Sequence, residues 1–247
     1  MTQRLDAALA ARGLARSRTH AATLIADGLV SVDGRVVVKS STPVDPDADL
    51  VVAGSDHYVS RAAHKLIAGL DAFAVDPAGR VALDMGASTG GFTQVLRERG
   101  ADPVLAVDVG HGQLAPSIRA DAGVIVVEGF NVRHMTRESL AAATGVAAAP
   151  SIITGDLSFI SLELVLPAVV EVCAAGADVV LLIKPQFEVG REQVGKGGIV
   201  RDEKAQLAAL EKVRSAVANL GPVQIDTIES PILGAEGNRE FLLYAVF

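Results

Sequence analysis

The sequence predicts an α/β domain built on a mostly parallel sheet, preceded by a smaller α+β unit. Two observations predict the sheet. Short apolar runs recur along residues 64–247, separated by segments with a helical pattern. The last two runs leave no room for a helix between them. The smaller unit is predicted at residues 1–54, which carry a strong hairpin signal of their own. Residues 55–63 turn polar and are predicted to be the linker.

The smaller unit is expected to run helix, helix, hairpin, strand. Thr2 is expected to cap the first helix and Ser17 the second, because both hydroxyls can accept a bond from a free N–H. The next stretch, LVSVDGRVVV, alternates apolar and polar residues around Asp33-Gly34, which predicts a hairpin. A further strand is expected at DLVVAG.

Five apolar runs are expected to form the parallel strands of the larger domain. They are Val81–Asp84, Val104–Val107, Val124–Val127, Ile152–Ile153 and Val179–Ile183. Their alternation with helical text predicts a sheet covered on both faces. The final runs, PVQIDTIES and EFLLYAVF, are joined by PILGAEGNR, which is too short for a crossover helix. These two runs are therefore expected to form an antiparallel hairpin at the sheet edge.

Composition bounds the class of protein. Half of the 247 residues are hydrophobic, which is enough for a substantial core. The single cysteine, Cys173, excludes an internal disulfide framework and favours a reducing, cytoplasmic setting. The most apolar tract, Leu162–Ile183, is broken by charges and a proline, so no membrane span is expected. The net charge of −7 does not indicate a nucleic-acid binder, so any polyanion contact would use local basic clusters.

The stretch VALDMGASTGGFTQVL places a glycine-rich turn between a strand and a helix that starts near Gly91. Parallel sheets bind ligands at the carboxyl ends of their strands, and glycine lets the backbone approach a ligand closely. The spacing is neither G-x-G-x-x-G nor a P-loop. The pattern acid-x-Gly-x-x-x-Gly-Gly instead resembles the first motif of S-adenosylmethionine (SAM) methyltransferases. The alternative is a purely structural turn, since many α/β proteins contain one.

SAM is therefore the expected cofactor, and no metal site is predicted. Asp84 is expected to organise the turn around the amino-acid end of SAM. Asp108 ends the second strand and is expected to accept hydrogen bonds from the ribose hydroxyls. Asn131, after the third strand, is a candidate for the adenine edge. The contacts expected within the turn are Gly86, Ala87, Ser88, Thr89, Gly90, Gly91 and Phe92.

Four charged residues are expected at the same edge of the sheet. Asp156 and Lys184 each end an apolar run, and Glu240 begins the last, antiparallel strand. Lys65 lies on a helix that leads into the first strand and can lie over this edge. A ribose hydroxyl needs its proton withdrawn before it can attack a methyl group. A desolvated lysine flanked by another cation can have its pKa lowered enough to act as that base. The alternative is a pair of structural ion pairs.

Taken together, the motifs resemble those of the TlyA family. Lys65, Asp156, Lys184 and Glu240 match the Lys-Asp-Lys-Glu tetrad of FtsJ-like ribose 2'-O-methyltransferases. The first 50 residues resemble an S4 RNA-binding domain, and VSRAAHKL, LDMGASTGGFT, DLSFISL, IKPQFEVG and GNREF are similar to further motifs of the family. The resemblance implies a Rossmann-like SAM methyltransferase sheet with a terminal antiparallel hairpin, preceded by an S4-like domain.

The resemblance also implies a reaction, the 2'-O-methylation of cytidine in ribosomal RNA within ribosomal subunits. Lys184 would be the general base, Asp156 and Glu240 would orient lysines and hydroxyl, and Lys65 would position the hydroxyl and stabilise charge. Large-subunit RNA is the expected substrate, because the chain resembles the shorter members of the family, and small-subunit RNA is the alternative. The expected phosphate contacts are Arg4, Arg16, Arg18, Lys39 and Arg61, each of which has a solvated surface charge as its alternative. No obligate protein partner is inferred.

Two other functions compete with this one. The family is also named for haemolysis, but the sequence shows no signal peptide, no spanning helix and no amphipathic basic helix, which disfavours a cytolysin. A non-catalytic RNA-binding or ribosome-assembly factor is the other alternative. The presence of all four tetrad residues argues against such a loss of catalysis.

Overall fold

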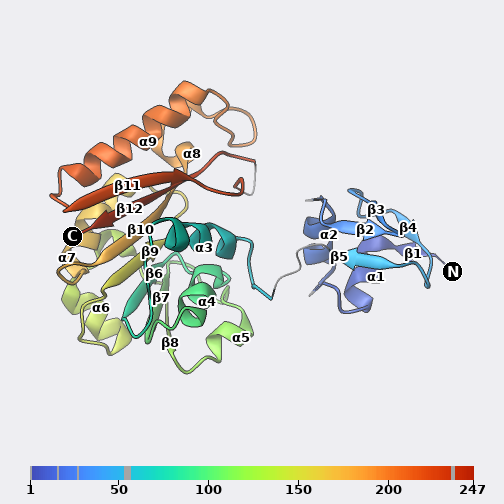
Figure 1. Ribbon diagram of the computed structural model, residues 1–247, viewed down its shortest axis with the longest axis horizontal. Helices are drawn as coiled ribbons and strands as arrows, with labels where there is room; N and C mark the ends of the chain where they lie inside the picture. The colour runs from blue at the N-terminus through green and yellow to red at the C-terminus, as the bar shows by residue number, and fades with distance from the viewer. Residues whose placement is uncertain (1, 16, 27, 53–56, 235–236) are drawn as a thin grey trace. The chain divides into compact units, whose positions relative to one another are not determined.

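The chain folds into two compact units, Met1–His57 and Tyr58–Phe247 (Figure 1). The structure, a computed structural model, describes residues 2–15, 17–26, 28–52, 57–234 and 237–247. The boundary assigned from the sequence, with 55–63 as the linker, falls partly outside these residues and stays a prediction. Helix α3 already begins at Ala62.

The smaller unit packs two helices against short strands. Its elements are α1 (Leu5–Ala11), α2 (Arg18–Ala26), β1 (Gln3–Arg4), β2 (Val30–Val32), β3 (Arg35–Val36), β4 (Pro43–Val44) and β5 (Leu50–Val52). The sheet order is β3-β2-β5, and β1 pairs separately with β4. The predicted hairpin is confirmed, because Asp33 and Gly34 both have positive φ, 49° and 76°, as a two-residue primed turn requires.

One of the two expected helix caps in this unit is confirmed and the other is wrong. Ser17 Oγ accepts the His20 N–H at 3.1 Å at the start of α2. Thr2 does not cap α1, which begins at Leu5 after Arg4. The reason is non-local, since Gln3–Arg4 is taken into antiparallel pairing with Pro43–Val44.

The larger unit contains a seven-stranded sheet with the order β11-β12-β10-β9-β6-β7-β8. Its strands are β6 (Ala82–Met85), β7 (Val104–Asp108), β8 (Val124–Glu128), β9 (Ile152–Gly155), β10 (Asp178–Ile183), β11 (Gln224–Glu229) and β12 (Phe241–Val246). Strands β6 to β10 are parallel, whereas β12 runs antiparallel to both β10 and β11. The expected parallel runs and the terminal hairpin are thus confirmed (Figure 1).

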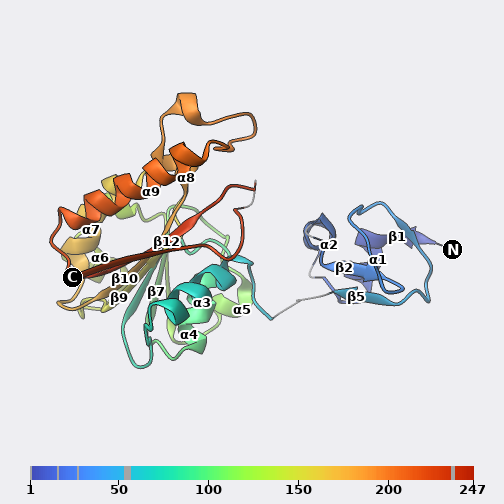
Figure 2. The same cartoon turned by 45° about the horizontal axis from the view of Figure 1, so that its top comes forward.

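Helices cover both faces of this sheet, as Figure 2 shows. Those on one face are α6 (Arg137–Thr144), α7 (Leu166–Val172) and α9 (Glu203–Ala218), and those on the other are α3 (Ala62–Ala72) and α4 (Gly91–Glu98). Short elements complete the unit: α5 (Pro116–Arg119), α8 (Pro185–Glu188) and the 3₁₀ turns η1 (Val132–His134), η2 (Leu162–Leu164) and η3 (Arg191–Gln193). Side chains alternate between the two cores along each strand. Leu83 therefore packs toward α7, and Ala82 packs toward α4.

Cys173, which directly follows α7, is buried in the core. Within the part of the chain that the structure describes, none of the helices combines the length and the apolar character that crossing a membrane requires.

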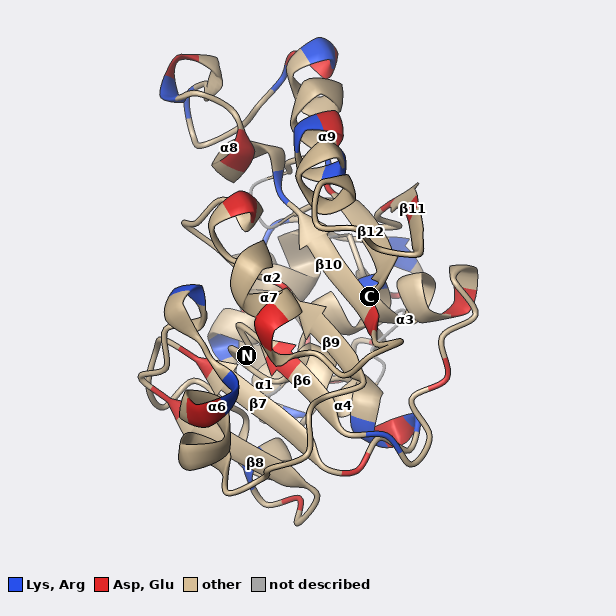
Figure 3. Cartoon of the chain, turned by 90° about the vertical axis from the view of Figure 1, so that its left-hand side faces the viewer, with Lys and Arg blue, Asp and Glu red and all other residues tan. Residues whose placement is uncertain are grey.

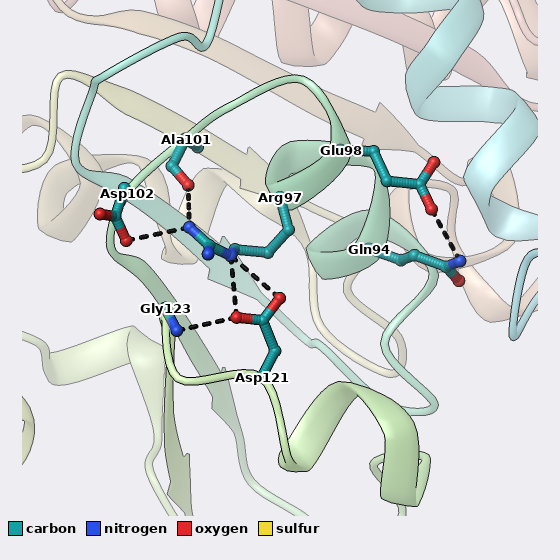
Figure 4. Close-up of polar contacts among 7 residues, drawn as sticks. All are labelled: Gln94, Arg97, Glu98, Ala101, Asp102, Asp121 and Gly123. Carbon is teal, nitrogen blue, oxygen red and sulfur yellow. Dashed lines mark hydrogen bonds and ion pairs between the residues drawn. The ribbon is translucent and has the colours of Figure 1, made fainter.

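A polar cluster holds the connections at the amino-terminal edge of the sheet (Figure 4). Arg97, near the end of α4, lies 3.1 Å from Asp121 and 2.9 Å from Asp102 and donates to the Ala101 carbonyl. Asp121 also accepts the Gly123 N–H at 2.8 Å, just before β8. The hydrogen bonds from Arg97 hold the pKa of Asp121 below its usual value. These contacts lie where the strands begin. They are therefore at the opposite edge of the sheet from the glycine-rich turn, which follows the end of β6.

Candidate active site

The glycine-rich turn joins β6 to α4, which begins at Gly91 as the sequence predicts. Gly86, Ser88 and Gly90 all have positive φ, 78°, 47° and 100°. A Cβ at Gly90 would lie 2.9 Å from Leu114 Cδ1, so glycine is required there for both conformation and space. The turn is thus a tight backbone curve that ends in the free N–H groups of a helix.

A cavity of about 170 Å³ lies against this turn. The turn contributes Gly86, Ala87, Ser88, Thr89, Gly91 and Phe92, which are six of the seven turn contacts expected from the sequence. The rest of the lining is Ser60, Ala62, Asp156, Ser158 and Lys184. The glycine-rich turn therefore lines the same cavity as the acid Asp156 and the amine Lys184.

Asp84 lies in the core beneath the turn and is fully buried. Its carboxylate accepts a bond from Thr93 Oγ1 of α4 at 2.6 Å and lies 3.2 Å from Thr154 Oγ1 of β9. Burial raises the pKa of Asp84 to about 7. The acid thus ties β6 to α4 below the cavity and is not among the described residues that line it.

Asp108, at the end of β7, holds the turn from the side. Its two carboxylate oxygens accept the backbone N–H groups of Ser88 at 2.8 Å and Gly110 at 2.7 Å. It borders a second hollow of about 10 Å³, which is space for about one water molecule. Asn131 is exposed and caps η1 by accepting the Arg133 N–H at 3.0 Å. The described residues that line the two hollows do not include Asn131.

The structure brings Lys184 to Asp156. Lys184 follows β10 directly and Asp156 follows β9, and these strands are parallel neighbours. Lys184 Nζ lies 2.6 Å from Asp156 Oδ1 and donates to Ser158 Oγ at 2.9 Å. The side chains of Lys184 and Asp156 are only 12% and 17% exposed, although both line the cavity. An ammonium group is therefore held between two oxygens at the cavity wall.

A second ion pair joins Lys65 of α3 to Glu240, which precedes β12. Lys65 Nζ donates to Glu240 Oε2 at 2.6 Å, with the side chains 9% and 2% exposed. In the antiparallel register of β10 and β12, Ile183 lies opposite Phe241. The next residues outward are Lys184 and Glu240, so their backbones are neighbours and the two ion pairs belong to the same edge of the sheet.

In the smaller unit, Asp6 gathers two of the arginines expected to contact RNA. Arg4 Nε lies 3.0 Å from Asp6 Oδ1, and an Arg18 guanidinium nitrogen lies 3.1 Å from Oδ2. The hydrogen bond from Arg4 lowers the pKa of Asp6 to about 2. Both arginines remain more than half exposed, at 51% and 61%, so a buried carboxylate presents them side by side. Sequence reasoning missed this role of Asp6.

The other three residues expected to contact RNA are Lys39, Arg61 and Arg16. Lys39 is exposed on the smaller unit. Arg61 is exposed at the start of α3 in the larger unit. Arg16 lies outside the described residues.

Two residues near the cavity carry chemistry that sequence reasoning did not assign. Ser158 accepts the bond from Lys184 described above. Phe159 is 91% exposed, has a φ of 64°, and its ring centroid lies 5.2 Å from that of Phe187. Both residues lie in the motif DLSFISL. From the sequence we could predict only that this motif follows a strand. Which of its side chains turn toward Lys184 is a property of the folded loop.

Comparison with known proteins agrees with this architecture. Residues 58–247 match the family described as FtsJ-like methyltransferase, and residues 3–50 match the S4 domain. The chain is 48% identical to the 16S/23S rRNA (cytidine-2'-O)-methyltransferase TlyA of Mycobacterium tuberculosis, over 98% of this chain and 88% of the relative. It is 36% identical to Hemolysin A of Brachyspira hyodysenteriae, over 98% of this chain and 99% of the relative. A solved structure from Streptococcus thermophilus, provisionally described as a hemolysin, is 37% identical with a TM-score of 0.75, covering 99% of this chain and 88% of that one.

Proposed function

The chain belongs to the TlyA family of FtsJ-like methyltransferases, and from that premise we propose that it methylates the ribose 2'-oxygen of a cytidine in ribosomal RNA. One observation carries the proposal. The Lys184–Asp156 pair, at 2.6 Å, lines the same cavity as the glycine-rich turn. The proposed base would thus lie beside the expected methyl-donor site.

The residues around the turn have the donors and acceptors that SAM needs. Gly91 and Phe92 line the cavity at the first turn of α4, where the free N–H groups of a helix start can meet a carboxylate. Asp108 would accept hydrogen bonds from ribose hydroxyls, in competition with the N–H groups that it now binds. When bound, SAM supplies an electrophilic methyl group on sulfur.

Lys184, in its neutral amine form, would take the proton of the RNA 2'-hydroxyl and so make the ribose oxygen able to accept a methyl group. Asp156 would stabilise the ammonium that forms, and Ser158 would fix the direction of Nζ. Lys65 would stabilise charge on the oxygen, while Glu240 orients Lys65. The cavity lining supports these roles for Lys184, Asp156 and Ser158, whereas those of Lys65 and Glu240 rest on their place at the same edge of the sheet.

RNA would reach this site through contacts on both units. Arg4 and Arg18, which both pair with Asp6, would bind phosphates of the RNA backbone, together with the exposed Lys39 and Arg61. The exposed ring of Phe159 offers a surface on which an unstacked base can pack. We propose that the protein is cytoplasmic and acts on ribosomal subunits.

The test is transfer of a labelled methyl group from SAM to separated large and small ribosomal subunits. The label is then mapped to its nucleotide and to ribose or base. We expect a labelled ribose 2'-oxygen of cytidine, in the large subunit first. Loss of the base in Lys184→Ala should slow the reaction by about 100-fold or more, whereas Lys204→Ala, which removes an exposed lysine from α9, should not.

Two results would contradict the proposal. One is unchanged methylation by Lys184→Ala, which would remove the assignment of the base. The other is lysis of red cells by pure protein without methyltransferase activity, which would favour the function named in the Brachyspira relative.

A further inference from the structure

A buried carboxylate beside the site has no part in the chemistry described above. Glu188 is the last residue of α8, the short helix that begins directly after Lys184. Its side chain is 1% exposed, and burial raises the pKa of its carboxyl group. A buried acid is costly unless its oxygens are bonded, so its partners indicate what it holds.

Both oxygens of Glu188 bind the start of η2. Oε2 accepts a hydrogen bond from Ser161 Oγ at 2.6 Å, and Oε1 accepts the backbone N–H of Leu162 at 2.8 Å. Ser161 in turn caps η2 by accepting the Glu163 N–H at 3.3 Å. The carboxylate thus fixes the point at which the segment 156–162 ends.

The same segment begins at the partners of Lys184. Asp156 and Ser158 contact Lys184 Nζ at 2.6 and 2.9 Å, so 156–162 is attached to 184–188 at both ends. Midway, Phe159 has a φ of 64°, a conformation that is costly for a residue with a side chain. A segment strained in this way keeps its shape only when its surroundings impose it, and Glu188 supplies one of the two attachments.

Helix α9 also contacts Glu188. Lys212 Nζ donates to the Glu188 carbonyl at 3.1 Å and lies 4.0 Å from its Oε2. Lys212 also pairs with Glu163 at 2.7 Å. Figures 2 and 3 show α8 beside α9, at an end of the domain where basic and acidic residues are interspersed. The attachment therefore has a rigid support.

We propose that Glu188 is a positioning residue for methyl transfer, holding segment 156–162 against α8 so that Asp156 and Ser158 stay in contact with Lys184 Nζ. This inference rests on the proposed function. A displacement of about 1 Å at a reacting group can lower a rate by about 100-fold. Glu188 itself is not among the described residues that line the cavity, so the binding of SAM should depend on it less than the reaction rate does.

The experiment compares Glu188→Ala, Glu188→Gln and Ser161→Ala with the wild-type chain. Three quantities are measured: the single-turnover methylation rate with saturating SAM and ribosomal subunits, the Kd for SAM, and hydrogen exchange at the Leu162 amide. Glu163→Gln is the matched control. It removes the charge of the 40% exposed acid that pairs with Lys212, and it leaves both hydrogen bonds of Glu188 to Ser161 and Leu162 in place.

We expect Glu188→Ala to slow single-turnover methylation by about 10- to 100-fold, with a change in Kd for SAM of less than about twofold and faster exchange at Leu162. Glu188→Gln keeps an oxygen for Leu162 and a group that can bond Ser161, so its rate should recover to within about threefold of wild type. If Glu188→Ala does not fold, Ser161→Ala removes only one of the two bonds and should still slow the reaction.

Three outcomes would overturn the inference. A wild-type rate in Glu188→Ala despite faster Leu162 exchange would show that the contact exists but positions nothing. Equal losses in Glu188→Ala and Glu188→Gln, with weaker SAM binding in both, would show a general structural role. Unlabelled subunits with the wild-type protein would overturn the proposed function itself, and this inference with it.

Discussion

The buried pair of Lys65 and Glu240 allows a prediction about stability that does not depend on any assay of activity. The perturbation is Lys65→Met, which keeps the length of the side chain and removes its charge. Glu240 is 2% exposed and its partner lies at 2.6 Å, so the substitution leaves an acid buried without its cation. Breaking such a pair from one side costs about 3–5 kcal/mol. That is a large part of the roughly 5–15 kcal/mol that stabilises a domain.

The assay is urea unfolding followed by far-ultraviolet circular dichroism, because the chain has no tryptophan. The matched control is Arg99→Met. It breaks the ion pair between Arg99, which follows α4, and Asp71, which lies on α3 together with Lys65. That pair has a similar distance, 2.8 Å, but its side chains are 40% and 57% exposed. The control should cost about 1 kcal/mol or less, because water already screens both charges.

A double variant separates the lost attraction from the stranded charge. Lys65→Met combined with Glu240→Leu replaces the pair by apolar groups, and should lie within about 1–2 kcal/mol of wild type. The reasoning would be refuted if Lys65→Met cost no more than Arg99→Met, or if the double variant were as unstable as the single one.

Three further predictions concern the turn and two acids. Gly90→Ala should lower stability by about 1–3 kcal/mol in urea, since its φ is 100° and its Cβ would meet Leu114, whereas Gly79→Ala has open space and should cost less; equal costs would contradict this. The pKa of Asp84 is raised from 3.8 to about 7, so the folded chain keeps a proton that the unfolded chain loses between these values, and stability should fall as pH rises through this window. Thermal unfolding of Asp84→Asn across the same range should lack that slope. The pKa of Asp6 is lowered from 3.8 to about 2, so its contribution is present above pH 3.8 and is lost as pH falls toward 2. Asp6→Asn should not show that loss, and a parallel loss in both proteins would rule out the ion pairs as its cause.

Most of the fold was predictable because its signals are local. The hairpin at Asp33-Gly34 follows from two residues that accept positive φ, and each parallel strand follows from a short apolar run. Asp156 and Lys184 could be expected to meet because each ends a strand of one parallel sheet, where the carboxyl ends share an edge. In these cases the sequence neighbours of a residue decide its conformation, and the direction of the strand decides its edge.

Tertiary structure alone decided which partners the charged groups found. Lys65 and Glu240 are 175 residues apart, and they meet because α3 packs on the sheet beside β12. The expected cap at Thr2 failed because a distant strand pairs with the two residues after it. The sequence did not predict that Glu188 contacts Ser161, because this contact requires α8, η2 and α9 to pack together. Neighbouring residues determine the helices, strands and turns, because periodicity and turn preferences are local properties. The partner of a buried charge depends instead on how whole elements pack.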